Sequence, residues 1–126
     1  MGGLVLQSRT VLLVEDNALV GLDAEDMLRL MGARAVIMAH TLASARQSLA
    51  GGSVELVVLD FLIGTERSEE FAREVQARGL PLVFASGLAS TAQLPDDIRQ
   101  IPVVTKPYST ASLAAAFAAV GIGIGG

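Results

Sequence analysis

Several residue types on which catalysis often depends are scarce in this chain of 126 residues. It has no cysteine, which excludes disulfides and metal sites built on thiolates. Its single histidine, His40, leaves no room for a histidine-based zinc site or a Ser-His-Asp triad. Its single lysine, Lys106, contrasts with eight arginines. Carboxylates, hydroxyls and one ammonium group therefore remain as the candidate reactive groups.

Long hydrophobic runs and clusters of positive charge are also missing. The net charge is −4 and the basic residues are scattered singly, which argues against a nucleic-acid-binding surface. Residues 1–8, MGGLVLQS, lack the positive charge and the apolar length of a signal peptide. No apolar run approaches the roughly 20 residues of a membrane span. We therefore expect a cytoplasmic protein that neither binds nucleic acid nor inserts into a membrane.

The length and the apolar content, 52%, suit one domain with a single core. We place that domain at residues 10–120, with flexible tails at residues 1–9 and 121–126. The last tail, GIGIGG, matches the GxGxxG pattern of dinucleotide-binding loops, but no helix can follow it. This match therefore carries no functional prediction.

Dense apolar runs alternate along the chain with segments of helical periodicity. The runs are typical of strands that are covered on both faces. We predict strands over residues 11–14, 35–39, 56–60, 81–85 and 101–104. We predict helices over residues 20–31, 42–49, 68–76 and 113–120. Residues 93–100 are weakly patterned and interrupted by Pro95, so any helix there should be short.

This strict alternation predicts a parallel sheet with helices on both faces. Ligands bind such sheets at the carboxyl ends of the strands. The residues expected at those ends are Glu15, Asp16, Asp60, Ser86 and Lys106. Three acids, one hydroxyl and one cation should therefore meet at one edge of the sheet.

Acids that lie close together repel one another unless a cation neutralises them. Oxygen ligands without cysteine or histidine select a hard ion such as Mg²⁺, which often shares its site with phosphate oxygens. A carboxylate such as Asp60 can attack phosphorus and form an acyl phosphate. Lys106 and the hydroxyl of Ser86 can then bind phosphoryl oxygens, and Gly87 leaves room for close approach. The constellation therefore indicates phosphoryl transfer.

Four motifs stand in a familiar order, namely VLLVEDN, VVLD, FASG and TKPY. From about Thr10 to Val120 the chain resembles the receiver domains of bacterial two-component response regulators. The resemblance implies a flavodoxin-like (βα)5 fold, a doubly wound α/β sheet of five parallel strands in the order 2-1-3-4-5. FASG, KPY and LDFLIGTERS also resemble the FAT GUY subfamily, with Ser86 in place of its threonine.

The resemblance implies a role for each residue of the metal site. It assigns Asp16 as a direct Mg²⁺ ligand and Glu15 as a ligand that acts more through water. Asp60 and the backbone carbonyl of Leu62 complete the implied set.

The resemblance also implies the reactive residues. Asp60 is the expected phosphoacceptor, Lys106 pairs with the phosphoryl group, and the hydroxyl of Ser86 moves toward it. The Lys106-Pro107 bond is often cis in the family. Most receivers carry an aromatic switch residue where this chain has Val103, and Tyr108 lies two residues after the lysine. We therefore expect the region after the fourth strand to transmit the signal, and the role of Tyr108 is open between packing and switching.

The partners implied by the family are a histidine kinase or a histidine phosphotransfer protein, and a downstream protein target. The domain would also catalyse its own slow dephosphorylation. The roughly 20 residues after Lys106 are too few for an output domain. A stand-alone regulator, a phosphate sink and the receiver of a hybrid kinase all remain open.

Three other functions fit less well. A phosphatase of the haloacid dehalogenase type needs a second acid two residues after the nucleophile, where this chain has Leu62. A serine hydrolase needs a glycine two residues before Ser86 and a histidine partner, and the chain has neither at that site. A pseudo-receiver that never takes phosphate is disfavoured by the intact set of Asp16, Asp60, Ser86 and Lys106.

Overall fold

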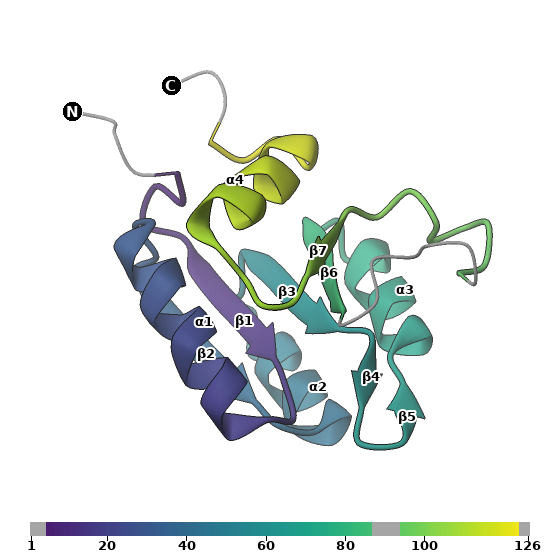
Figure 1. Cartoon of the computed structure of the whole chain (residues 1–126). Coiled ribbons are helices and arrows are strands. Elements are labelled where there is room, and N and C mark those ends of the chain that lie inside the picture. The colour runs from purple at the N-terminus through teal and green to yellow at the C-terminus, as the bar shows by residue number, and fades with distance from the viewer. Residues whose placement is uncertain (1–4, 87–93, 124–126) are drawn as a thin grey trace.

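The computed structural model describes residues 5–86 and 94–123. Its centre is a sheet of five parallel strands in the order β2-β1-β3-β6-β7 (Figure 1). These strands are β1 (Thr10–Val14), β2 (Ala35–Ala39), β3 (Leu56–Asp60), β6 (Leu82–Ser86) and β7 (Val103–Thr105). Counted within this sheet alone, the order is 2-1-3-4-5, which confirms the predicted fold.

Over the described residues, four helices cover the two faces of the sheet, and they are α1 (Ala18–Leu30), α2 (Leu42–Ala50), α3 (Glu69–Ala77) and α4 (Thr110–Ala119). Helices α1 and α4 pack on one face, and α2 and α3 pack on the other (Figure 1). Each strand contributes side chains to both faces because successive side chains point to opposite sides. Along β1, Leu12 joins the cluster under α2 and α3, whereas Leu13 joins the cluster under α1 and α4.

Polar side chains cap the first turns of α1 and α2. The side chain of Asn17 accepts hydrogen bonds from the N–H groups of Leu19 and Val20, and Thr41 accepts one from Ser44. These contacts satisfy N–H groups that have no partner within the helix. These capping side chains therefore fix where α1 and α2 begin.

A two-stranded hairpin follows β3 directly and was not predicted. Its strands are β4 (Leu62–Ile63) and β5 (Glu66–Arg67), with Leu62 opposite Arg67. Gly64 turns the chain with a φ of 62°, a conformation that favours glycine. Ile63, only 4% exposed, anchors the hairpin in the core. The hairpin therefore projects beside the carboxyl end of β3 (Figure 1).

Residues 94–100 form a bend followed by turns at 96–100, so the short helix allowed there by the sequence does not occur over these residues. Leu94 and Ile98 nevertheless pack into the core. Gln93 and the stretch 87–92 lie outside the described residues.

The segment before β1 packs on the body of the domain. Leu6 is fully buried, and its N–H donates to the carbonyl of Met31 at 2.9 Å. Near the other end, Ile122 is buried in the same cluster. The predicted domain boundaries stay a prediction, and residues 1–4 and 124–126 of the two expected tails lie outside the described residues.

Within the described ranges, no helix is both long and apolar enough to cross a membrane.

Candidate functional site

Three charged side chains from separate strand ends meet at the carboxyl edge of the sheet. Asp60 is the last residue of the central strand β3, Glu15 follows β1, and Lys106 follows β7. Parallel neighbouring strands end at one edge, so residues far apart in the chain come together there. The Nζ of Lys106 lies 2.8 Å from Oδ2 of Asp60 and 2.7 Å from Oε1 of Glu15.

The acids form one cluster. Glu15, Asp16 and Asp60 each place a carboxylate oxygen within 4.8 Å of the others. Glu15 and Asp60 are buried, whereas Asp16 is exposed and opens the cluster to solvent. A set of carboxylate oxygens suits a hard divalent ion. The residues brought together therefore fit the kind of cation that the sequence predicts, and the cluster resembles the metal site of receiver domains.

Glu15 is held from several sides. Its Oε2 accepts a hydrogen bond from the N–H of Asn17 at 3.1 Å, and its Oε1 lies 3.3 Å from the hydroxyl of Tyr108. Its backbone carbonyl lies 2.9 Å from Nδ1 of His40. Because a carbonyl oxygen only accepts, Nδ1 of His40 carries the proton. His40, which is exposed, therefore donates this hydrogen bond to the backbone of Glu15.

Burial sets the protonation behaviour of Asp60. The pKa of its carboxyl is raised to about 6, and burial is the largest cause of the rise. The hydrogen bond from Lys106 lowers this pKa, whereas the charge of Glu15 raises it. Burial lowers the pKa of Lys106, but its hydrogen bonds to Asp60 and Glu15 prevail and the pKa is raised. The ammonium form of Lys106 is therefore secured by the two carboxylates that it contacts.

The hairpin β4–β5 braces this cluster. The N–H of Gly64 donates to Oδ2 of Asp16 at 2.8 Å. At the base of the hairpin, Oγ of Ser68 donates to the carbonyls of Asp60 and Phe61 at 2.7 and 2.9 Å. The guanidinium of Arg67 lies 5.1 Å from the centroid of the Phe61 ring. These contacts fix the backbone that leaves Asp60 and hold one oxygen of Asp16.

Comparisons with solved structures identify the fold and the family. No protein-family model matches the chain, and a search of curated proteins finds no match. The structure of a CheY-like response regulator receiver domain from Methylobacillus flagellatus shares the fold, with 16% identity, a TM-score of 0.76, and coverage of 89% of this chain and 98% of that chain. The solution structure of SdrG from Sphingomonas melonis Fr1 is 32% identical, with a TM-score of 0.77 over 89% of this chain and 95% of SdrG. The chain belongs to the receiver domains of response regulators. The BeF3-activated conformation of SdrG from Pseudomonas melonis Fr1 also matches, at 30% identity and a TM-score of 0.75 over 93% of this chain and 97% of that chain.

In this receiver domain, Ser86 is the last residue of β6 and is half-buried. Its backbone carbonyl accepts a hydrogen bond from the N–H of Lys106 at 2.8 Å, so the two predicted site residues share one strand pairing. The role of its hydroxyl stays a prediction. Gly87 and Leu88, which follow it, lie outside the described residues.

Leu62 is the first residue of β4, two positions after Asp60, and its side chain is half-exposed. This position is consistent with a backbone carbonyl near the acids, and its role as a ligand stays a prediction.

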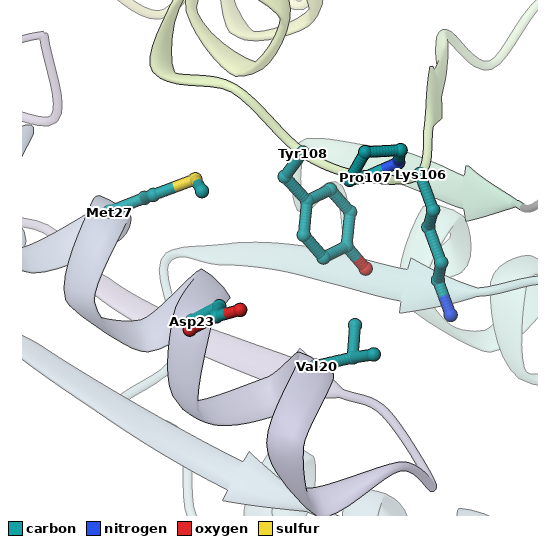
Figure 2. Close-up of a pocket in the computed structure, with 6 residues that line it drawn as sticks. All are labelled: Val20, Asp23, Met27, Lys106, Pro107 and Tyr108. Atoms are coloured by element: carbon teal, nitrogen blue, oxygen red, sulfur yellow. The ribbon is translucent and has the colours of Figure 1, made fainter.

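The loop from β7 to α4 completes the site of the receiver domain. The Lys106-Pro107 peptide bond is cis, as the family resemblance implied. Tyr108 is buried and lines a pocket of about 300 Å³ with Lys106, Pro107 and three residues of α1, which are Val20, Asp23 and Met27 (Figure 2). Neither the hairpin nor the contact of Tyr108 with Glu15 was predicted. Gly64, which lies between β4 and β5, was the only signal for the hairpin in the sequence.

Proposed function

We propose that this domain accepts a phosphoryl group on Asp60 from a phosphohistidine of a histidine kinase or a histidine phosphotransfer protein. The observation that carries the proposal is the Asp60 carboxylate at the end of the central strand, 2.8 Å from Lys106 and within the acid cluster. The resemblance to two-component receivers supplies the class of donor.

The reaction is a displacement at phosphorus. An oxygen of Asp60 forms the new P–O bond while the P–N bond to the donor histidine breaks, and the departing imidazole takes up a proton. Lys106 neutralises negative charge on the transferred group. A Mg²⁺ held by Glu15, Asp16, Asp60 and the carbonyl of Leu62 would supply further positive charge to the phosphoryl oxygens. The hydroxyl of Ser86 would donate to another of these oxygens.

Phosphorylation of Asp60 would lead to a signal and then to loss of the phosphoryl group. We infer a cytoplasmic member of the FAT GUY subfamily that signals by contact with a downstream protein or serves as a phosphate sink. The domain then removes its own phosphoryl group slowly, when water attacks the acyl phosphate. The motifs FASG and KPY support the subfamily, and Val103 at the usual switch position supports a route of signalling that differs from most receivers.

The test is an intact-mass measurement after incubation with Mg²⁺ and either acetyl phosphate or phosphoramidate. We expect an adduct of about 80 Da, the mass of one phosphoryl group, located on Asp60 by peptide mapping. Asp60→Ala should lose the adduct. Asp97→Ala is the matched control, because Asp97 is an exposed aspartate paired with Arg73 and lies outside the site.

Two outcomes would replace the proposal. No adduct in the presence of Mg²⁺ would indicate a pseudo-receiver that acts by contact alone. Rapid multiple turnover of small phosphate esters would indicate a phosphatase.

A further inference from the structure

Tyr108 lies beside the phosphorylation site without a role in the chemistry described so far. It is 7% exposed and follows Lys106 by two residues. Figure 2 shows its hydroxyl and the amine of Lys106 extending from one loop toward the same side. The hydroxyl lies 3.3 Å from Oε1 of Glu15.

That oxygen of Glu15 has two side-chain donors. Lys106 lies 2.7 Å away, whereas the Tyr108 hydroxyl is farther than the usual 2.5–3.0 Å of an O–H···O hydrogen bond. Glu15 is only 1% exposed, so water cannot readily replace a lost donor. In the unphosphorylated protein, Lys106 therefore satisfies this oxygen and the hydroxyl contributes little.

Phosphorylation of Asp60 would bring new negative oxygens close to Lys106. A phosphoryl group on Asp60 adds negative oxygens beside an ammonium group that already lies 2.8 Å from Oδ2. As Lys106 turns to them, Oε1 of Glu15 loses its closer donor. Among the side-chain donors described for this oxygen, Tyr108 is then the one that remains, beside the Mg²⁺ that Glu15 would help to hold.

The pocket beside Tyr108 leaves room for a small movement of its ring. One side of its ring borders the space of about 300 Å³ in front of α1, lined by Val20, Asp23 and Met27 (Figure 2). The ring is therefore not clamped on that side by packed atoms. A shift of a few tenths of an ångström would bring the hydroxyl to normal hydrogen-bonding distance from Glu15.

We propose that Tyr108 is a positioning residue of the phosphorylation site, whose hydroxyl holds the Glu15 carboxylate while Lys106 binds the phosphoryl group. The inference rests on the proposed function. The hydroxyl acts on the phosphorylated form and leaves the resting form nearly unchanged, a distinction that a purely structural tyrosine would not show.

The test compares wild type, Tyr108→Phe and Tyr108→Leu. Beryllofluoride with Mg²⁺ serves as a stable mimic of the phosphoryl group, and its affinity is measured by amide NMR titration. Tyr108→Phe keeps the ring and removes only the hydroxyl. We expect it to bind beryllofluoride about 10-fold to 100-fold more weakly, the range for one hydrogen bond to a charged group. Its melting temperature without ligand should stay close to that of wild type.

Tyr108→Leu separates the hydroxyl from the ring. It removes the ring as well, so it should lower the melting temperature, and its loss of beryllofluoride affinity should be at least that of Tyr108→Phe. If the ring alone mattered, Tyr108→Phe would instead restore wild-type affinity.

A spectroscopic measurement follows the contact directly. Tyr108 is the chain's only tyrosine and there is no tryptophan, so tyrosine labelled with ¹³C at Cζ gives one resonance. In wild type, that resonance should shift when beryllofluoride binds, because the hydrogen bond to Glu15 tightens.

The outcomes distinguish the two proposals. If wild type binds beryllofluoride and Tyr108→Phe binds it equally well, or the Cζ resonance does not move, the inference is overturned while the proposed function stands. If wild type neither binds beryllofluoride nor gains phosphoryl mass, both fail together.

Discussion

Replacing Asp60 with asparagine should make the metal-free protein more stable at neutral pH. Asp60 is 7% exposed, and burial is the main reason that the pKa of its carboxyl is raised from 3.8 to about 6. A rise of roughly two pH units, at about 1.4 kcal/mol per unit, gives an upper bound of about 3 kcal/mol for the cost of the charged form. Screening by water at the open edge of the sheet reduces this to roughly 1–2 kcal/mol. Asparagine has nearly the same shape and carries no charge, so it escapes this cost.

The sign of the pH dependence follows from the raised pKa. Folded Asp60 holds its proton more tightly than unfolded Asp60, so this group favours folding most below about pH 4. Its contribution falls as the pH rises through about 6 and is constant above that. The stability gain of Asp60→Asn should therefore be small near pH 4 and complete by about pH 7. Urea denaturation with a chelator present, followed by far-UV circular dichroism between these pH values, measures the difference in free energy of unfolding.

Asp97→Asn is the matched control, because Asp97 has the opposite environment. A hydrogen bond from Arg73 lowers the pKa of this exposed carboxyl. Any effect of that variant should therefore have the opposite sign, with wild type gaining as the pH rises. A variant Asp60→Asn that is less stable than wild type at pH 7, or a difference that does not vary with pH, would refute the reasoning.

Two further changes probe the metal cluster and the N-terminal segment. Asp16→Asn should stabilise the metal-free protein by about 1 kcal/mol, the repulsion of charges near 4.8 Å in a water-like medium, and weaken Mg²⁺ binding in a titration. A lower melting temperature for this variant would contradict a crowded acidic cluster. Leu6→Ala should cost about 2–4 kcal/mol in urea denaturation because Leu6 is fully buried. An unchanged midpoint would show that the segment before β1 does not stabilise the domain.

The strands were predictable because their apolar runs are dense and bounded by polar residues. Strands β2 and β3 match the predicted residues 35–39 and 56–60 at both ends. Strands β6 and β7 begin one and two residues later than predicted, and both follow a proline. Pro81 and Pro102 accept hydrogen bonds through their carbonyls, from Val57 and Phe84, but have no N–H to donate. The apolar pattern extends through these prolines, whereas full strand pairing does not.

The residues of the site that lie at the ends of parallel strands could be predicted from the sequence. Glu15, Asp60 and Lys106 meet because each lies at or just after the carboxyl end of a strand. The contacts that support them depend on loops. The hairpin strands have two residues each, too few for a periodic pattern. The hydrogen bond from Gly64 to Asp16 joins residues 48 positions apart, so no local pattern predicts it. The reach of Tyr108 to Glu15 depends on how the loop after β7 turns, which local sequence does not determine.

The described ends of the chain lie next to each other, on the side of the domain where β1 begins (Figure 1). A Cβ atom on Gly123 would lie only 2.8 Å from Cγ1 of Val5, so the first and last described residues lie side by side. A circular permutant that joins these ends would therefore need only a short linker. Fluorescent proteins fused at these ends would therefore lie close together. A reporter of activation is better attached to the hairpin or to α1, which flank the reactive edge.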